Sequence, residues 1–177
     1  MRRIDRISLG TALGICGFCA VASLAQADVV ALRAAKDNTL YEANPTGSNG
    51  VGDYVFTGTN SQALVSRTVL AFDIAGNIPP GSTIHSVTLQ LHASRVSNGT
   101  SETTSLHRLL ADWGEAWSDA VGEEGGGAAA TDGDATWLHR FFPNDFWTNA
   151  GGDFVASASA SLNVSGTGTY TWSDAGM

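Results

Sequence analysis

The stretch FVASASASLNV, residues 154–164, decides the fold class because apolar and polar side chains alternate along it. A period of two places one set of side chains against a core and the other in water, as in a half-buried β-strand. Residues 87–93, VTLQLHA, alternate in the same way. Residues 69–74 are instead apolar at nearly every position, which predicts a central strand covered on both faces.

Four shorter stretches also favour strands, at residues 28–35, 54–57, 104–110 and 169–172. Glycine, proline and asparagine mark turns between them, at residues 44–53, 79–81, 98–99 and 151–152. Residues 111–120 could form a helical turn, but no stretch of the sequence carries a helical stripe with a cap. Many short strands separated by turns predict an all-β fold, an antiparallel β-sandwich or jelly roll.

Residues 1–27 have the pattern of a secretory signal peptide. Three arginines form a basic start, residues 7–24 are mostly apolar, and an Ala-Gln-Ala triplet provides a small-residue cleavage site. We therefore expect cleavage between Ala27 and Asp28 and a secreted, extracellular protein that is no longer attached to a membrane. An uncleaved membrane anchor is the alternative.

Both cysteines, Cys16 and Cys19, lie inside this signal, so residues 28–177 contain no disulfide and have the length of one domain. The formal charge of −8 includes +2 from the signal, three arginines against one aspartate, which leaves −10 for residues 28–177. This acidity disfavours nucleic acid and anionic membranes as partners. We expect no cofactor.

Residues 122–134 are rich in glycine, alanine and acids and lack apolar periodicity. A loop of this length and composition favours disorder. A calcium site is the alternative, with oxygen ligands from Glu123, Glu124, Asp132 and Asp134, although the full EF-hand pattern is absent from the sequence. We expect no metal site, and we expect His107 and His139 to be packed or hydrogen-bonded instead.

Several motifs occur in an order that carries a family resemblance: KDNTLYE at residues 36–42, LAFDIA and IPPGSTI within residues 70–84, SLHRLLADWGE at residues 105–115 and GDATWLHR at residues 133–140. Together they resemble a DNRLRE-type domain, a secreted β-sandwich related to a carbohydrate-binding module family with alginate-binding members. The resemblance covers essentially residues 28–177. It implies a module that binds polysaccharide without catalysis.

The family pattern continues, after a segment like the YTW of residues 170–172, into a tryptophan-rich NFGW-like stretch and the hexapeptide that names the family. This sequence stops at Met177 and has neither. The resemblance therefore implies a domain that is truncated at its C-terminus, with unpaired strand edges and an open core. A shorter but competent variant of the domain is the alternative.

Carbohydrate recognition uses flat aromatic rings that stack on sugar faces and polar groups that bond hydroxyls or carboxylates. The candidate platforms are Trp113, Trp117, Trp137 and Trp147. For an acidic polysaccharide the candidate cations are Lys36, Arg67, Arg108 and Arg140. Trp113 and Trp137 lie in the family motifs and are the better candidates for burial, whereas Trp117 and Trp147 are the better surface candidates.

The carboxylates of Asp112 and Glu115 could in principle form a pair for glycoside hydrolysis. The sequence has no nucleophile elbow, no zinc-protease motif and no phosphate loop, so we expect no enzyme. The resulting hypothesis is a secreted carbohydrate-binding module, and an acidic polysaccharide is its candidate ligand. The alternative is a structural or adhesive extracellular β-sandwich without a ligand of its own.

Overall fold

The structure is a computed structural model that describes residues 28–96, 101–173 and 177, so the predicted signal peptide with Ala27 lies outside the described residues. Within the described residues the regular secondary structure consists of β-strands, and no helix is present. The all-β fold class is therefore confirmed. Residues 111–120, where a helical turn was an option, are irregular.

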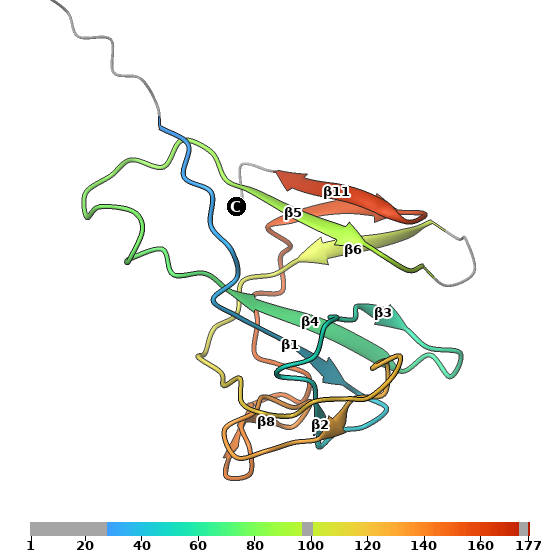
Figure 1. Ribbon diagram of the computed structural model, residues 1–177. Helices are drawn as coiled ribbons and strands as arrows, with labels where there is room; N and C mark the ends of the chain where they lie inside the picture. Colours follow the sequence, from blue (N-terminus) through green and yellow to red (C-terminus); the bar gives the residue numbers. More distant parts are fainter. Residues whose placement is uncertain (1–27, 97–100, 174–176) are drawn as a thin grey trace, which may run out of the picture.

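Figure 1 shows two layers of strands. The lower layer is an antiparallel sheet of order β1-β4-β3, formed by Lys36–Tyr41, Val65–Ala71 and Gly58–Thr59. The upper layer holds two antiparallel pairs, β5 (Thr88–Ala93) with β11 (Gly168–Ser173) and β6 (Glu102–Leu106) with β10 (Ala160–Val164). Two short pairs order the loops, β2 (Gly47–Ser48) with β7 (Ala128–Ala129) and β8 (His139–Phe141) with β9 (Asp145–Phe146).

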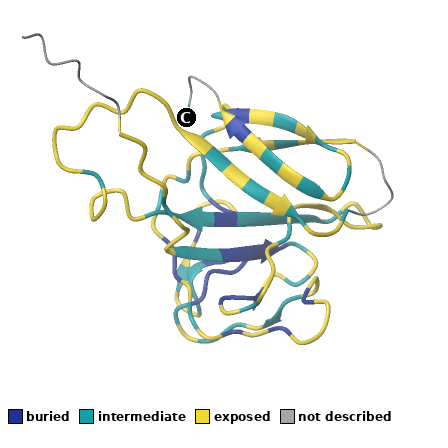
Figure 2. Cartoon of the chain, turned by 45° about the horizontal axis from the view of Figure 1, so that its top comes forward, coloured by how far each residue is buried: buried dark blue, intermediate teal, exposed yellow. Residues whose placement is uncertain are grey.

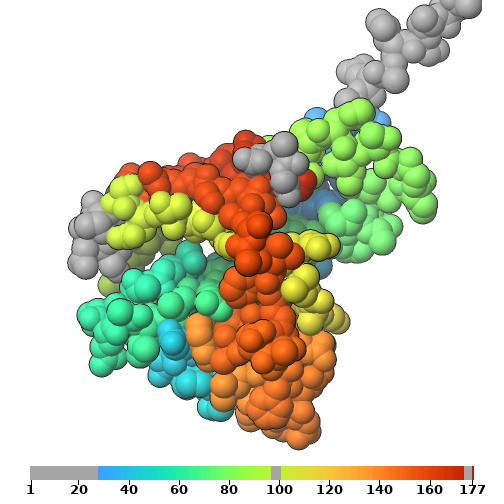
Figure 3. Space-filling view, turned by 180° about the vertical axis from the view of Figure 1, so that it is seen from behind, coloured from blue at the N-terminus to red at the C-terminus, as the bar shows by residue number. Residues whose placement is uncertain are grey.

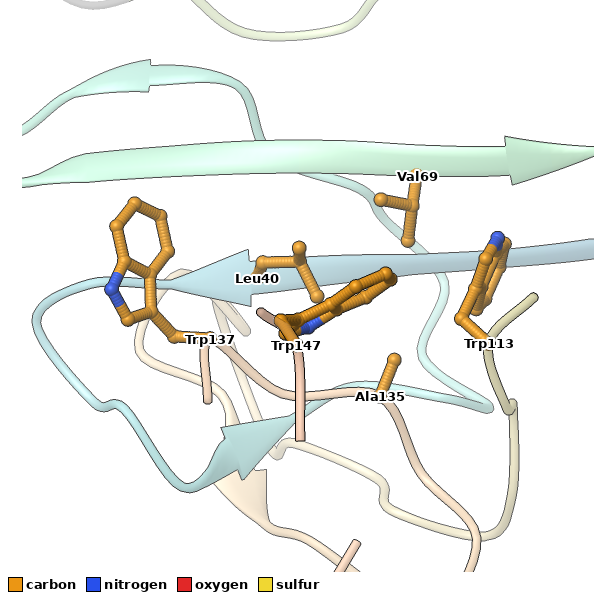
Figure 4. Packing of buried hydrophobic residues seen from close by; sticks show 6 residues of the cluster. All are labelled: Leu40, Val69, Trp113, Ala135, Trp137 and Trp147. Carbon is orange, nitrogen blue, oxygen red and sulfur yellow. The ribbon is translucent and has the colours of Figure 1, made fainter. Parts of the chain in front are cut away.

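The hydrophobic core lies on the face of β1 and β4 that carries Leu40 and Val69. Figure 4 shows how loop residues pack against these two side chains, with contributions from Trp113, Ala135, Trp137 and Trp147. Arg67 lies with its guanidinium 4.9 Å from the centroid of the Trp137 ring, and its Nη1 donates to the Gly151 carbonyl at 2.6 Å. A Cβ at Gly151, where φ is +85°, would come within 2.7 Å of Trp137, so this turn requires glycine.

The upper layer keeps the alternation predicted from its sequence, with one polar exposed face and one half-buried apolar face (Figure 2). Leu89 and Leu91 of β5 are half-buried and lie opposite Trp172 and Tyr170 of β11. The same pattern holds for β10, where Leu162 is half-buried between exposed neighbours. Within the described residues, these four strands contribute nothing to the core cluster around Leu40.

Several predicted strands are shorter than expected or absent. Residues 154–164 form a strand only as β10, because Phe154 makes an isolated bridge to Leu109 and the chain bends before it pairs with β6. Residues 54–57 form no strand, since the Phe56 N–H donates to Thr39 Oγ1. Residues 28–35 are also irregular. The strand predicted at residues 69–74 is central in its sheet, but β4 ends at Ala71 and leaves Ile74 exposed.

Residues 122–134 pack into the structure through two buried carboxylates, and the expectation of disorder is wrong. Glu124 accepts hydrogen bonds from Asn49 Nδ2 at 2.9 Å and from the N–H groups of Asp53 and Tyr54 at 3.2 and 3.0 Å. These bonds, led by that from Asn49, hold the pKa of Glu124 below its ordinary value. Asp134 is fully buried. The loop is thus fixed by hydrogen bonds to carboxylates, which a search for apolar periodicity does not detect.

Candidate functional site

Trp117 differs from the other tryptophans in its exposure to solvent. It is 81% exposed, whereas Trp113, Trp137, Trp147 and Trp172 are at most 8% exposed. The surface position expected for Trp147 is wrong, because its Nε1–H donates to the Thr136 carbonyl at 2.9 Å inside the core cluster. Trp113 and Trp137 are buried in the same cluster and are packing residues. Of the four candidate platforms, Trp117 alone offers a ring face to a ligand.

The backbone on both sides of Trp117 is held by hydrogen bonds. The Trp117 N–H donates to Thr131 Oγ1 at 2.9 Å, and the preceding N–H donates to Asp134 Oδ1 at 2.7 Å. On the other side, the Ser118 carbonyl accepts from the Val51 N–H at 3.0 Å, and Ser118 Oγ accepts from the Gly50 N–H at 2.8 Å. Because the backbone at Trp117 is fixed, a ligand that covers the ring orders less of the protein on binding.

A shallow, open depression lies beside the indole and is lined by Gly50, Val51, Glu115, Ala116 and Trp117. Gly50 allows the two loops to approach each other closely. A Cβ at this position would lie 2.6 Å from Asp134 Oδ1 and 2.7 Å from the Ala116 carbonyl oxygen. The depression is open to solvent, so a ligand can reach the indole from the surface.

Glu115 supplies the carboxylate of this depression. Its Oε1 accepts the Asp37 N–H at 3.3 Å. Burial raises the pKa of Glu115, and the charge of Asp37 raises it further. Asp112, the other member of the carboxylate pair considered for hydrolysis, is exposed and bonded to Lys36, which lowers its pKa. Both side chains are exposed, but Glu115 makes one hydrogen bond to the backbone and can accept more, while Asp112 is engaged in an ion pair with Lys36.

The ammonium group of Lys36 is already bonded to other groups of the protein. Its Nζ lies 2.8 Å from Asp112 Oδ1, donates to the Trp113 carbonyl, and stands 4.8 Å from the centroid of the Trp113 ring. Its role is to tie the start of β1 to the loop that carries Trp113. An anionic ligand would have to displace Asp112 to reach this ammonium group.

The other candidate cations differ in their availability. Arg140 makes a two-pronged contact with Asp145, at 2.8 and 2.7 Å from its Nη2. Arg67 is bonded to Gly151 beneath the core. Arg108 is exposed. The structure thus brings two of the four predicted cations together, since Lys36 and Arg140 both bond to Asp112.

Two of the acids considered for calcium, Glu124 and Asp134, are engaged by hydrogen bonds from protein groups. Asp134 accepts from the N–H and hydroxyl of Thr131 at 2.8 and 2.9 Å, besides the bond to Ala116. Within the described residues, no group of three or more His, Asp or Glu side chains is arranged to hold a metal ion. His139 is buried, with Nδ1 2.9 Å from Thr136 Oγ1. Burial lowers the pKa of His139.

Comparisons with models of protein families, with curated proteins and with solved structures found no match to this chain. Among the residues that the structure describes, no helix has the length and apolar character needed to cross a membrane. The function must therefore be inferred from the exposed indole and its surroundings.

Proposed function

We propose that this chain is a secreted, non-catalytic carbohydrate-binding module that uses Trp117 as its platform. One observation carries the proposal: a large, exposed indole stands on a backbone held from both sides, beside an open depression. The flat apolar face of an indole suits the C–H face of a sugar ring. The Glu115 carboxylate next to it can accept hydrogen bonds from sugar hydroxyls.

The ligand in this proposal is a neutral polysaccharide. A polymer of uronic acids requires cations that are free to bond its carboxylates. Lys36 and Arg140 are instead paired with Asp112 and Asp145. The exposed Arg108 does not line the depression, which contains the carboxylate of Glu115. The negative net charge of the chain also disfavours an anionic polymer. The proposal thus departs from the acidic polysaccharide that the family resemblance implies.

The test is electrophoresis of the purified full chain through native gels that contain β-glucan, xylan, mannan or alginate. We expect retardation in at least one neutral gel and less in alginate. Trp117→Ala should weaken binding about tenfold, because loss of one aromatic stacking contact costs about 1.5 kcal/mol. Glu115→Gln keeps the shape of the side chain and should weaken binding less, since an amide oxygen still accepts hydrogen bonds.

Phe146→Ala is the matched control, because Phe146 is a second exposed aromatic residue and lies in β9, outside the depression. Its ring packs on His139, 4.2 Å between centroids. The control should bind like the unsubstituted chain. Equal binding by Trp117→Ala, or no retardation in any neutral gel, would overturn the proposal. Stronger retardation in alginate than in every neutral gel would overturn the choice of ligand.

A further inference from the structure

One edge of β4 has backbone groups that pair with nothing in the described residues. Along β4 the backbone N–H and C=O groups of successive residues point alternately toward β1 and toward the opposite edge. The Glu42 N–H donates to the Val65 carbonyl, so the groups that point toward β1 belong to Val65, Arg67, Val69 and Ala71. Ser66, Thr68 and Leu70 turn theirs to the opposite edge. β3 pairs there only with Val65 and Ser66. Within the described residues, no strand pairs with Thr68 and Leu70 on this edge, and the Thr68 hydroxyl donates to the Phe56 carbonyl at 3.0 Å.

This open edge faces the upper layer. In Figure 1, β1 lies on one side of β4 and the strands of the upper layer lie on the other. Figure 3 shows the surface hollowed between the upper layer and the teal segment that precedes β4. The upper layer also has an apolar face that is only half-buried, with Leu89, Leu91 and Tyr170. An added strand on β4 would gain backbone hydrogen bonds and cover apolar surface together.

The chain itself carries a segment with the properties of such a strand. Residues 28–35, DVVALRAA, are apolar at six of eight positions, which is typical of a strand covered on both faces. In the structure they are irregular, and Val29 and Val30 are 94% and 49% exposed. Asp28 and Arg33 cancel in charge, so the segment does not add to the repulsion between acidic chains.

The segment does not reach the open edge of its own β4. The Ala35 N–H is bonded to the Ala71 carbonyl at 2.7 Å, and Lys36 then begins β1 on the paired side of β4. Figure 1 shows the segment leaving the body from this point and running outward past the end of the upper layer. To reach Thr68 and Leu70 it would have to cross the end of β4 and reverse its direction. A second molecule has no such constraint.

We propose that residues 28–35 of one molecule add as a strand to the open edge of β4 in a second copy of this chain. The donating segment and the accepting edge are different surfaces, so the contact is heterologous. A pair of bound molecules still has one free donating segment and one free accepting edge. The contact therefore generates chains of molecules, or a ring if the geometry closes. This gives the protein an assembly function that is independent of carbohydrate binding at Trp117.

The test is sedimentation velocity of the purified full chain over a range of concentrations, with the double variant Val29→Asp, Val30→Asp. We expect the unsubstituted chain to associate into species of twice the monomer mass and above, and the variant to remain monomeric. The control is Ile84→Asp, Val121→Asp. It adds the same charge at apolar residues of 53% and 93% exposure outside the depression, close to the 49% and 94% of the donor residues. The control should associate like the unsubstituted chain.

Hydrogen exchange adds a readout at the accepting edge. The amides of Thr68 and Leu70 should be protected when the chain associates and should exchange rapidly in the monomeric variant. A chain that is monomeric at every concentration would overturn the proposal, as would equal association of the donor variant. Protection of both amides in the monomer would also overturn it, because a segment of the same molecule would then occupy the edge.

Discussion

Asp134→Asn tests whether a buried carboxylate fixes the loop that presents Trp117. Asp134 is fully buried and accepts three hydrogen bonds, from the Ala116 N–H and from the N–H and hydroxyl of Thr131. The amide has the same shape but replaces one acceptor oxygen with an NH₂ group that cannot accept. About two charge-assisted bonds are lost or weakened, each worth roughly 1.5–3 kcal/mol. We expect the free energy of unfolding to fall by about 3 kcal/mol.

The assay is urea unfolding followed by tryptophan fluorescence, with Asp132→Asn as the control. Asp132 lies two residues away in the same loop, is exposed, and undergoes the same change in charge. The control should stay within about 0.5 kcal/mol of the unsubstituted chain. Equal stability of the two variants would refute the reasoning, because the loop would then not depend on the bonds of Asp134. A large loss in the control alone would refute it as well.

Three further predictions concern the core, a buried phenol and the platform. Trp147→Ala should lower the free energy of unfolding by about 3–5 kcal/mol in the same urea assay, because it removes a buried indole and leaves the Thr136 carbonyl without its donor. Burial raises the pKa of Tyr41 to about 12. The free energy of unfolding should therefore keep its full contribution from Tyr41 below pH 10 and fall as the pH rises toward 12, which urea unfolding at a series of pH values would show. Trp117→Ala should change stability by no more than about 0.5 kcal/mol in urea, because its ring packs against little of the protein.

The strands that can be predicted from the sequence are those in which apolar and polar residues alternate and whose partner strand alternates in the same way. Residues 87–93 have this property, and β5 forms within them against an equally alternating β11. Residues 154–164 alternate just as regularly, yet their first half is not a strand. There the bridge from Phe154 to Leu109 draws the chain toward the core, and that partner lies far away in the sequence. Local periodicity cannot report such a contact.

In the candidate site, too, the sequence near a residue does not determine whether that residue is buried or exposed. Trp117 and Trp147 both lie in loops without clear periodicity, and nothing near them in the sequence separates them. Trp147 is buried because β1 and β4 present Leu40 and Val69 to it, and these strands precede it by many residues. The groups that hold Trp117, among them Thr131 and Gly50, are small polar or glycine residues of the kind that any loop contains. Their role becomes visible only once the loops are placed together.

The central claim is that the exposed face of Trp117 binds sugar, and acrylamide quenching of tryptophan fluorescence tests it most directly. Trp117 is the accessible indole among five, so it dominates quenching in the free protein. A neutral polysaccharide that retards the chain in gels should cover this ring and lower the quenching constant. The fluorescence of Trp117→Ala should be quenched weakly with or without the polymer. An unchanged quenching constant in the unsubstituted chain at saturating polysaccharide would contradict the account.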